Sequence, residues 1–398
     1  AALAGAPLRE RLGEVYATLA EPVRLASRPK QLALSPSQVA IGPLSLREGA
    51  LTVPLRIGLL PAVQAAREAA RRQQCLSNLR QQSLGLINYE SANGRLPSAF
   101  DYPTLANPAI LAPSQIGWNW ALRILPHIEQ APLFNQINYT NLVLNAPDPK
   151  TPQIAHALNA PVRMAIIEAF RCPSDSYNTI MMQADGSANP PLWARGNYAA
   201  NAGNGPLLSA RCDSINGPFS AGWMDPRRRG VMGPNVSVKL REISDGTSNT
   251  MLIGEVRAGV TPRDQRGTWA LGQAGASVLF WHGSGSDASG PNSCVPGMNA
   301  DDVKGPTPAD IPLLEAECMN EYTQDDWADQ ATARSKHVGG VNIGLADGSA
   351  RFISNNIDAG PPVIPTTANN PCPFTLRMAI WDRLIVATDD EPLDFSTF

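Results

Sequence analysis

Apolar side chains recur at helical spacing through residues 59–92, the longest such stretch in the chain. Residues that usually mark the ends of a helix frame it: Pro61, Asn93, Gly94 and Pro97. A helix of about 30 residues reaches roughly 45 Å. Its second half carries an apolar stripe that includes Leu76, Leu79 and Leu86. The pattern leaves two arrangements open, a helix that projects as a stalk and a helix that lies wholly on a core.

The pattern changes on both sides of this helix. Residues 1–57 begin with helical spacing and continue in short alternating stretches broken by Ser-Pro and Gly-Pro, which predicts a helix followed by an antiparallel ribbon. Residues 98–398 mix short helical and strand-like stretches with turns. We therefore predict an α+β fold in which a long N-terminal helix (58–97) packs on an antiparallel β-sheet head (98–398) with long loops.

Composition supports a loop-rich globular protein. The 398 residues are 43% hydrophobic, enough for a sizeable core, and include 36 prolines and 32 glycines. The formal net charge of -3 does not indicate nucleic acid or a membrane surface as a partner. No run of 18 apolar residues occurs, so the chain has no predicted membrane-spanning segment.

Charge is unevenly distributed along the chain. Residues 1–80 hold eleven Lys or Arg against five Glu (11 - 5 = +6), whereas residues 301–329 are strongly acidic. The acidic stretch is either a solvated loop or a docking surface for a basic partner. We predict an interface on the long helix that combines basic and apolar side chains: Arg67, Arg71, Arg72, Leu76, Leu79 and Leu86.

The six cysteines are widely spaced and form no C-x-x-C pair, which argues against a zinc ribbon or a thioredoxin-type redox pair. Disulfides under long loops would suit an oxidising compartment. Six cysteines allow fifteen full connectivities. We predict at least one bond, and Cys294 with Cys318 is the first choice because the two bracket the acidic stretch.

Near the C-terminus, "GGVNIGLADGSARFIS" alternates apolar and small or polar residues around Asp347 and Gly348. An Asp-Gly pair between such stretches predicts a hairpin with a type I′ turn. His337 lies just before the first strand, where its ring could bond a backbone carbonyl or a carboxylate across the sheet. We predict a structural role for His337; a metal ligand and a catalytic base are the alternatives. The chain lacks a G-x-S-x-G serine and a Cys beside a partner His, so we predict no enzymatic activity.

Two further motifs carry carboxylates in turns. Asp245, Thr247 and Asn249 have the spacing with which a calcium loop begins, but the closing Glu of an EF-hand is missing, so a side-chain-capped turn is the preferred interpretation. In "CPSD", Asp175 can accept backbone hydrogen bonds. We predict no cofactor and, apart from this weak calcium candidate, no metal.

Six motifs in order resemble a known family: "LLPAVQAAREAARRQQCLSNLRQQSLGLINYE", "WNWALRILPHIEQAPLFNQIN", "FRCPSD", "GNYAANAG", "ISDGTSNTMLIGE" and "HVGGVNIGLADGS". Together they are similar to the planctomycete-type family of pilin-like proteins of unknown function, whose C-terminal signature is His, nine residues, Asp-Gly. The resemblance covers about residues 58–360. Family members usually carry a prepilin-type apolar helix before this region, and residues 1–57 stand in its place. The resemblance implies a pilin-like head and a cell-surface or secretion-linked structural role.

Two functions follow as hypotheses. The first is a non-enzymatic extracytoplasmic subunit, pilin-like or pseudopilin-like, that forms homo-oligomers or docks into a larger surface assembly or filament. The alternative is an extracellular solute- or glycan-binding module, because such domains are sometimes classed with solute-binding proteins. Tryptophans could line its cleft, although core packing is the preferred interpretation for them: Trp118, Trp120, Trp193, Trp223, Trp269 and Trp281.

Overall fold

The structure is a computed structural model. It describes the backbone of six short strands between residues 23 and 57, and then residues 60–104, 113–183, 191–207, 217–283, 289–294, 301–303, 309–317, 320–321, 330–360 and 378–388. Side chains are described from residue 63 onward, those of 113, 302–303 and 320–321 excepted. The chain divides into two compact units, Ala1–Ala70 and Arg71–Phe398.

The described part of the first unit contains three antiparallel strand pairs and the start of the long helix. The pairs are β1 (Val23–Ser27) with β2 (Lys30–Leu34), β3 (Val39–Ile41) with β6 (Leu55–Ile57), and β4 (Ser45–Arg47) with β5 (Ala50–Thr52). All three pairs are antiparallel, the orientation expected of the predicted ribbon. The helix predicted before the ribbon lies outside the described residues.

The long helix α2 spans Leu60–Asn93. It ends where the sequence indicated, because Gly94 adopts φ +76° and its N–H donates to Glu90 O over 2.7 Å. A residue in the left-handed region after the last turn is a common helix stop, and glycine adopts it without the steric cost of a Cβ.

The second unit is built on a five-stranded sheet of order β13-β9-β12-β16-β17. Its strands are β9 (Tyr198–Asn201), β12 (Met251–Glu255), β13 (Val278–Leu279), β16 (Gly340–Leu345) and β17 (Ala350–Ser354). Four of the five pair antiparallel, as predicted, whereas β13 runs parallel to β9. The sheet is therefore mixed, and the α+β class is confirmed.

The remaining elements are short. The helices are α3 (Trp120–Ile124), α4 (Ala131–Phe134), α5 (Ala160–Arg163), α6 (Ala221–Met224), α7 (Ile311–Ala316) and α8 (Ile380–Ile385), with 3-10 helices η3 (Pro113–Gln115), η4 (Leu125–Ile128), η5 (Ala157–Asn159), η6 (Glu168–Phe170), η7 (Ser176–Thr179) and η8 (Leu240–Glu242). Two-residue strands pair as β7 (Met182–Gln183) with β8 (Leu192–Trp193), β10 (Met232–Gly233) with β11 (Val236–Ser237), and β14 (Asp302–Val303) with β15 (Asn320–Glu321).

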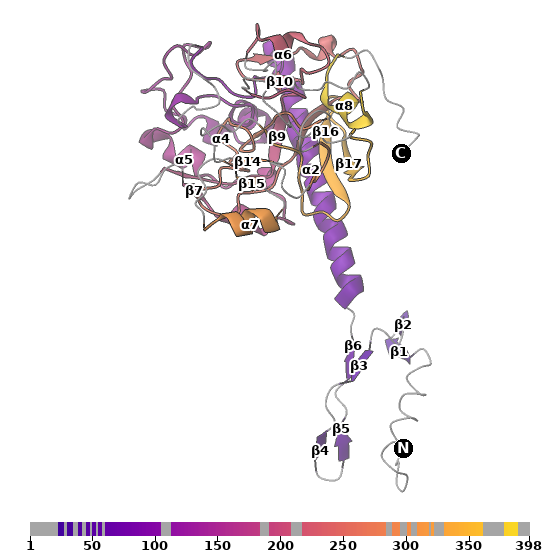
Figure 1. Cartoon of the computed structure of the whole chain (residues 1–398). Helices are drawn as coiled ribbons and strands as arrows, with labels where there is room; N and C mark the ends of the chain where they lie inside the picture. Colours follow the sequence, from indigo (N-terminus) through magenta and orange to yellow (C-terminus); the bar gives the residue numbers. More distant parts are fainter. Residues whose placement is uncertain are drawn as a thin grey trace. The chain divides into compact units, whose positions relative to one another are not determined.

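Strand β16 shows how the sheet is covered (Figure 1). Val341, Ile343 and Leu345 belong to the same apolar cluster as Trp381 and Leu384 of α8. On its other face the backbone of Gly344 approaches α2 so closely that a Cβ there would lie 2.3 Å from Ser83 Oγ. The alternation of apolar and small or polar residues along β16 thus gives the strand one face toward α8 and one toward α2. Glycine is required at residue 344 because the helix lies so close to the strand there.

The β16–β17 hairpin forms at the predicted Asp-Gly, but with a different turn. Only Gly348 has a positive φ (86°), and Asp347 does not. The Gly348 N–H donates to Leu345 O and the Leu345 N–H to Ser349 O. This is the pattern of a type I turn followed by a left-handed glycine, so the type I′ prediction was wrong. Asp347 instead stabilises the turn by accepting from Ser349 N over 2.8 Å.

Candidate functional site

A disulfide ties α2 to the head. Cys75, on the buried face of α2, is bonded to Cys172 in the "FRCPSD" segment, 97 residues further on, with a Cα–Cα distance of 5.4 Å. The prediction of at least one disulfide is confirmed. The pairing itself was not predicted, although Cys75 shares its helix face with Leu79 and Leu86, which is a signal that it is buried.

The helix also holds this segment through polar contacts. Asn78 donates from Nδ2 to the carbonyl oxygens of Glu168 and Arg171, and Gln82 donates from Nε2 to Ala169 O over 2.6 Å. The segment that carries Cys172 is thus fixed on α2 by hydrogen bonds as well as by the disulfide.

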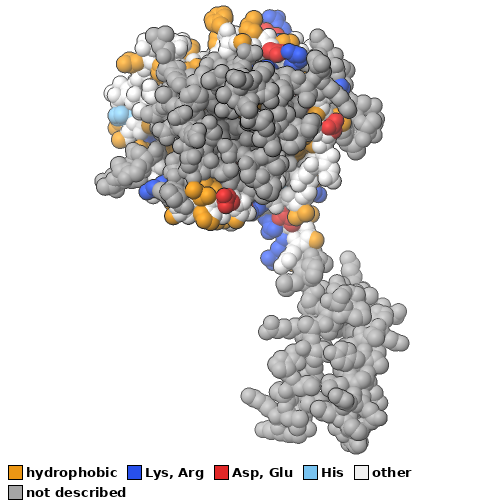
Figure 2. Space-filling view, in the orientation of Figure 1, with side chains coloured by type: hydrophobic (Ala, Val, Ile, Leu, Met, Phe, Trp, Pro, Cys, Tyr) orange, Lys and Arg blue, Asp and Glu red, His pale blue; other side chains and the backbone are white. Residues whose placement is uncertain are grey.

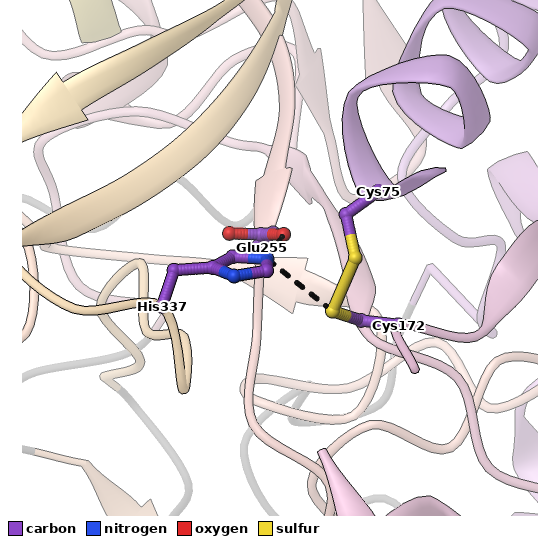
Figure 3. A group of neighbouring side chains, drawn as sticks. All are labelled: Cys75, Cys172, Glu255 and His337. Atoms are coloured by element: carbon purple, nitrogen blue, oxygen red, sulfur yellow. Dashed lines mark hydrogen bonds and ion pairs between the residues drawn. A yellow bond between two sulfur atoms is a disulfide. The ribbon is translucent and has the colours of Figure 1, made fainter. Parts of the chain in front are cut away.

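His337 lies against the disulfide (Figure 3). Its Nε2 is 3.4 Å from Cys172 Sγ and 3.3 Å from Glu255 Oε1. The side chains of His337 and Glu255 are each 1% exposed. A carboxylate across the sheet is therefore a partner of the ring, which is one of the two contacts that the sequence suggested.

Glu255, the last residue of β12, is held from the neighbouring strand. Asn342 of β16 donates from its backbone N to Oε2 over 2.7 Å and from Nδ2 to Oε1 over 2.9 Å. Burial, and after it the charge of Glu255, raises the pKa of Tyr198 well above its usual value. Tyr198 is a neutral phenol here, and it accepts from Asn78 Nδ2 over 3.3 Å.

A second buried carboxylate supports the Cys172 segment. Asp175 accepts from the backbone N–H groups of Tyr177 and Ala258, from Asn197 Nδ2 and from Arg257 Nε. Its predicted role as an acceptor of backbone bonds is confirmed. Asn197 Oδ1 in turn accepts a hydrogen bond from the Cys172 N–H over 2.9 Å. The "FRCPSD" and "GNYAANAG" segments are therefore joined in one hydrogen-bond network.

A cavity of about 380 Å³ opens beside Cys172. Its lining includes the polar or charged residues Gln74, Asn78, Arg171, Asp175 and Asn178. Molecules of the size of a small solute or a thiol reagent fit this volume.

The arrangement offers two kinds of chemistry. A disulfide beside an imidazole can undergo thiol–disulfide exchange, because a nearby imidazole can stabilise the thiolate that leaves. Sulfur, nitrogen and carboxylate oxygen are also the ligands that zinc prefers. We call these four residues the Cys/Glu/His group, and its potential ligand atoms all lie within 4.8 Å of one another: Cys75, Cys172, Glu255 and His337.

The structure does not bring His337 and Asp347 together into one site. Asp347 is exposed in the hairpin turn, whereas His337 is buried on Glu255 and the disulfide. Sequence reasoning missed three of the four members of the Cys/Glu/His group. Glu255 was recognisable only as a carboxylate at the end of a strand-like stretch.

The "DGTSN" stretch has the hydrogen bonds of a capped turn. Asn249 donates from Nδ2 to Asp245 O over 3.0 Å, and Gly246 adopts φ +93°. Asp245 is buried and accepts from Ser244 Oγ. The side-chain nitrogen of Asn249 points into the turn, whereas calcium binds oxygen atoms. This geometry supports a side-chain-capped turn over a calcium loop that begins at Asp245, Thr247 and Asn249.

The interface predicted on α2 needs correction. Leu76, Leu79 and Leu86 are buried in the core of the chain itself, so they cannot also supply an intermolecular surface. Arg67 is exposed, and Arg72 lies 4.7 Å over the ring of Phe352.

The acidic stretch is partly paired inside the chain. Asp301 contacts Arg266 and Arg334, and Glu317 pairs with Arg257 and Lys336. These two carboxylates are therefore not available to a basic partner, while residues 322–329 lie outside the described part.

Cys294 is disulfide-bonded, and its partner lies outside the described residues. The pairing with Cys318 therefore stays a prediction. Among the described residues, no helix combines the length and apolar character needed to cross a membrane.

Comparison with known proteins places the chain in a family. Residues 64–360 match the family model SBP_bac_10, whose description is "Protein of unknown function (DUF1559)". Searches of curated proteins and of solved structures gave no match. The matched region holds α2 from residue 64 onward, the five-stranded sheet and the whole Cys/Glu/His group. The chain therefore belongs to the DUF1559 family of proteins of unknown function.

Proposed function

We propose that the chain is a non-enzymatic structural subunit, pilin-like or pseudopilin-like, of an extracytoplasmic assembly. The observation that carries this proposal is the difference in side-chain burial between the two parts of α2. From Cys75 onward the helix supplies core residues, whereas its side chains between Val63 and Gln74 are exposed or half-buried. A helix that continues beyond the core it serves offers a surface for contact with other molecules.

The character of that surface favours a charged contact. Basic side chains gather on this part of α2 (Figure 2), where Arg67 is exposed and Arg71 and Arg72 are half-buried. Exposed charges are screened over about 10 Å at 0.1 M salt, so they steer association rather than hold it.

The buried disulfide supports an extracytoplasmic location. Structural disulfides persist in oxidising compartments and are rare in the cytosol. The non-enzymatic part of the proposal is supported by His337 in the oxidised chain, where its Nε2 faces a carboxylate and a disulfide sulfur, neither of which is a hydroxyl or thiol nucleophile.

The test is the size of the full-length oxidised chain in solution at low and high salt, by light scattering and electron microscopy. We expect concentration-dependent assembly that Arg67→Glu weakens and that the matched control Arg241→Glu, an exposed arginine of η8, leaves unchanged. A chain that stays monomeric at every concentration, or equal effects of both variants, would contradict the proposal.

A solute-binding module is the second candidate, favoured by the cavity beside Cys172, whose lining includes Arg171 and Asn78, and by the form of the name SBP_bac_10. The tryptophans do not support it, because the core contains five of the six: Trp118, Trp120, Trp193, Trp223 and Trp269. A saturable rise in melting temperature with a small sugar or peptide, lost in Arg171→Ala, would favour this function over assembly.

A further inference from the structure

The Cys/Glu/His group draws its members from four separate parts of the fold. Cys75 comes from α2, Cys172 from the loop after η6, Glu255 from the end of β12, and His337 from the segment before β16. All four are buried, and Figure 3 shows their functional atoms converging on one point. Such convergence of two sulfurs, an imidazole and a carboxylate goes beyond what a disulfide needs.

We propose that the Cys/Glu/His group is a four-coordinate zinc site when its two cysteines are reduced, so that the disulfide and the zinc ion are alternative states of the same site.

Two of the distances between the potential ligand atoms match the edges of a tetrahedral site, and all of these atoms lie within 4.8 Å of one another. Zinc binds sulfur at about 2.3 Å and nitrogen or oxygen at about 2.0–2.1 Å, which gives tetrahedral edges of about 3.5 Å from sulfur to nitrogen and about 3.3 Å from nitrogen to oxygen. The corresponding distances from His337 Nε2 are 3.4 Å to Cys172 Sγ and 3.3 Å to Glu255 Oε1. In a tetrahedral site the two sulfurs lie about 3.8 Å apart, so reduction has to separate them to that distance.

The surroundings orient the ligands as in known zinc sites. Hydrogen bonds from a neighbouring residue commonly fix a ligating carboxylate. Asn342 does this for Glu255 with two bonds, and Asn197 holds the backbone of Cys172. Because these contacts come from neighbouring backbone and side chains, they remain when the sulfur–sulfur bond is broken.

The cavity beside Cys172 provides access. It reaches the loop that carries this cysteine and the turn of α2 that carries Gln74 and Asn78. A small dithiol, or a zinc ion, can therefore approach Cys172 without unfolding of the sheet.

Conversion of the disulfide into two thiols needs two electrons and two protons. A dithiol reductant attacks the disulfide, forms a mixed disulfide and leaves as its own oxidised disulfide, while Cys75 and Cys172 gain two electrons and two protons. On binding zinc, the two thiols release two protons to solvent and bind as thiolates. His337 then binds through Nε2 as the neutral ring with its proton on Nδ1. A disulfide oxidant reverses the process and releases the ion.

The experiment uses the full chain, reduced with a water-soluble phosphine, which leaves as the phosphine oxide, and then freed of excess reagent. Cobalt(II) is added as a spectroscopic probe, followed by zinc(II). We expect one metal ion per chain, a sulfur-to-cobalt charge-transfer band, the visible spectrum of four-coordinate cobalt, and loss of both when zinc displaces it. The oxidised chain should give none of these signals.

Variants separate this group from the other cysteines. Cys75→Ser with Cys172→Ser keeps the remaining four cysteines and should abolish the cobalt spectrum. His337→Ala and Glu255→Gln leave the disulfide intact in the oxidised chain. In the reduced chain we expect each to weaken metal binding at least as much as the roughly 10- to 100-fold caused by loss of an outer-shell partner.

Three results would overturn the proposal: no metal bound by the reduced, folded chain; an unchanged spectrum in the double serine variant; or unfolding of the reduced chain, followed by circular dichroism, even with zinc present. The last result counts against it because a zinc ion in the proposed site would join the two segments that the disulfide joins, and would also hold the segments of Glu255 and His337.

Discussion

Removal of the Cys75–Cys172 disulfide should lower the free energy of unfolding by several kcal/mol, a substantial part of the roughly 5–15 kcal/mol typical of a folded protein. The bond closes a loop of 97 residues. In the chain-entropy model a loop of that size restricts the unfolded chain by about 4.7 kcal/mol. We therefore expect the free energy of unfolding of a Cys75→Ala, Cys172→Ala double variant to fall by about 3–5 kcal/mol in urea under non-reducing conditions.

Single variants provide the matched control. Either substitution alone breaks the cross-link, so Cys75→Ala, Cys172→Ala and the double variant should agree to within about 1 kcal/mol instead of adding. The urea m-value should rise in all three, because an uncross-linked chain exposes more surface when it unfolds. Additive losses, or a loss below about 1 kcal/mol with an unchanged m-value, would refute the reasoning.

Three further predictions concern single residues. His337→Ala should lower the free energy of unfolding by about 1–3 kcal/mol, since it leaves buried Glu255 without the imidazole; an unchanged urea midpoint would contradict this, and the half-buried His127 offers a control substitution. Gly94→Ala should cost about 1 kcal/mol because Gly94 has φ +76° with no neighbour within 4 Å, and Gly94→Asn should cost less; equal midpoints for both would argue against the left-handed helix stop. Burial lowers the pKa of His282 to about 3. In the unfolded chain the pKa of His282 is near 6.5, so as the pH falls His282 is protonated there before it is protonated in the folded chain. The stability that neutral His282 contributes is therefore fully present above about pH 6.5 and is lost toward pH 3 by up to about 1.4 kcal/mol per pH unit. His282→Gln should flatten the curve of urea midpoint against pH over this range, and parallel curves would show that His282 is not the group responsible.

Local features were predictable from the sequence. The bounds of α2 follow from Pro61 and Gly94, because each of these residues favours a helix end within one turn of its own position. The β16–β17 hairpin follows from the alternation of apolar and polar residues around Asp347. The turn type was missed because Asp347 is compatible with both the right-handed and the left-handed region, and only the register of the strands decides between them.

The site was not predictable because its contacts are long-range. His337 meets Cys172 across 165 positions, and no local pattern encodes that meeting. A histidine and a glutamate at the ends of strand-like stretches have many candidate partners until the strand order β12-β16 is known. The leucines of α2 show the same limit. Their apolar stripe predicted an intermolecular interface, but the partners that cover it are distant in the sequence and belong to the same chain, so the leucines lie in its core.

The disulfide at the first buried turn of α2 also has a mechanical consequence. If the chain is pulled by its two ends, the load passes from residue 75 to residue 172 through the covalent bridge. The 97-residue separation between them corresponds to roughly 330 Å of extended chain that the pull cannot release. A force applied to the N-terminal end of α2 therefore reaches the sheet without peeling the helix from it.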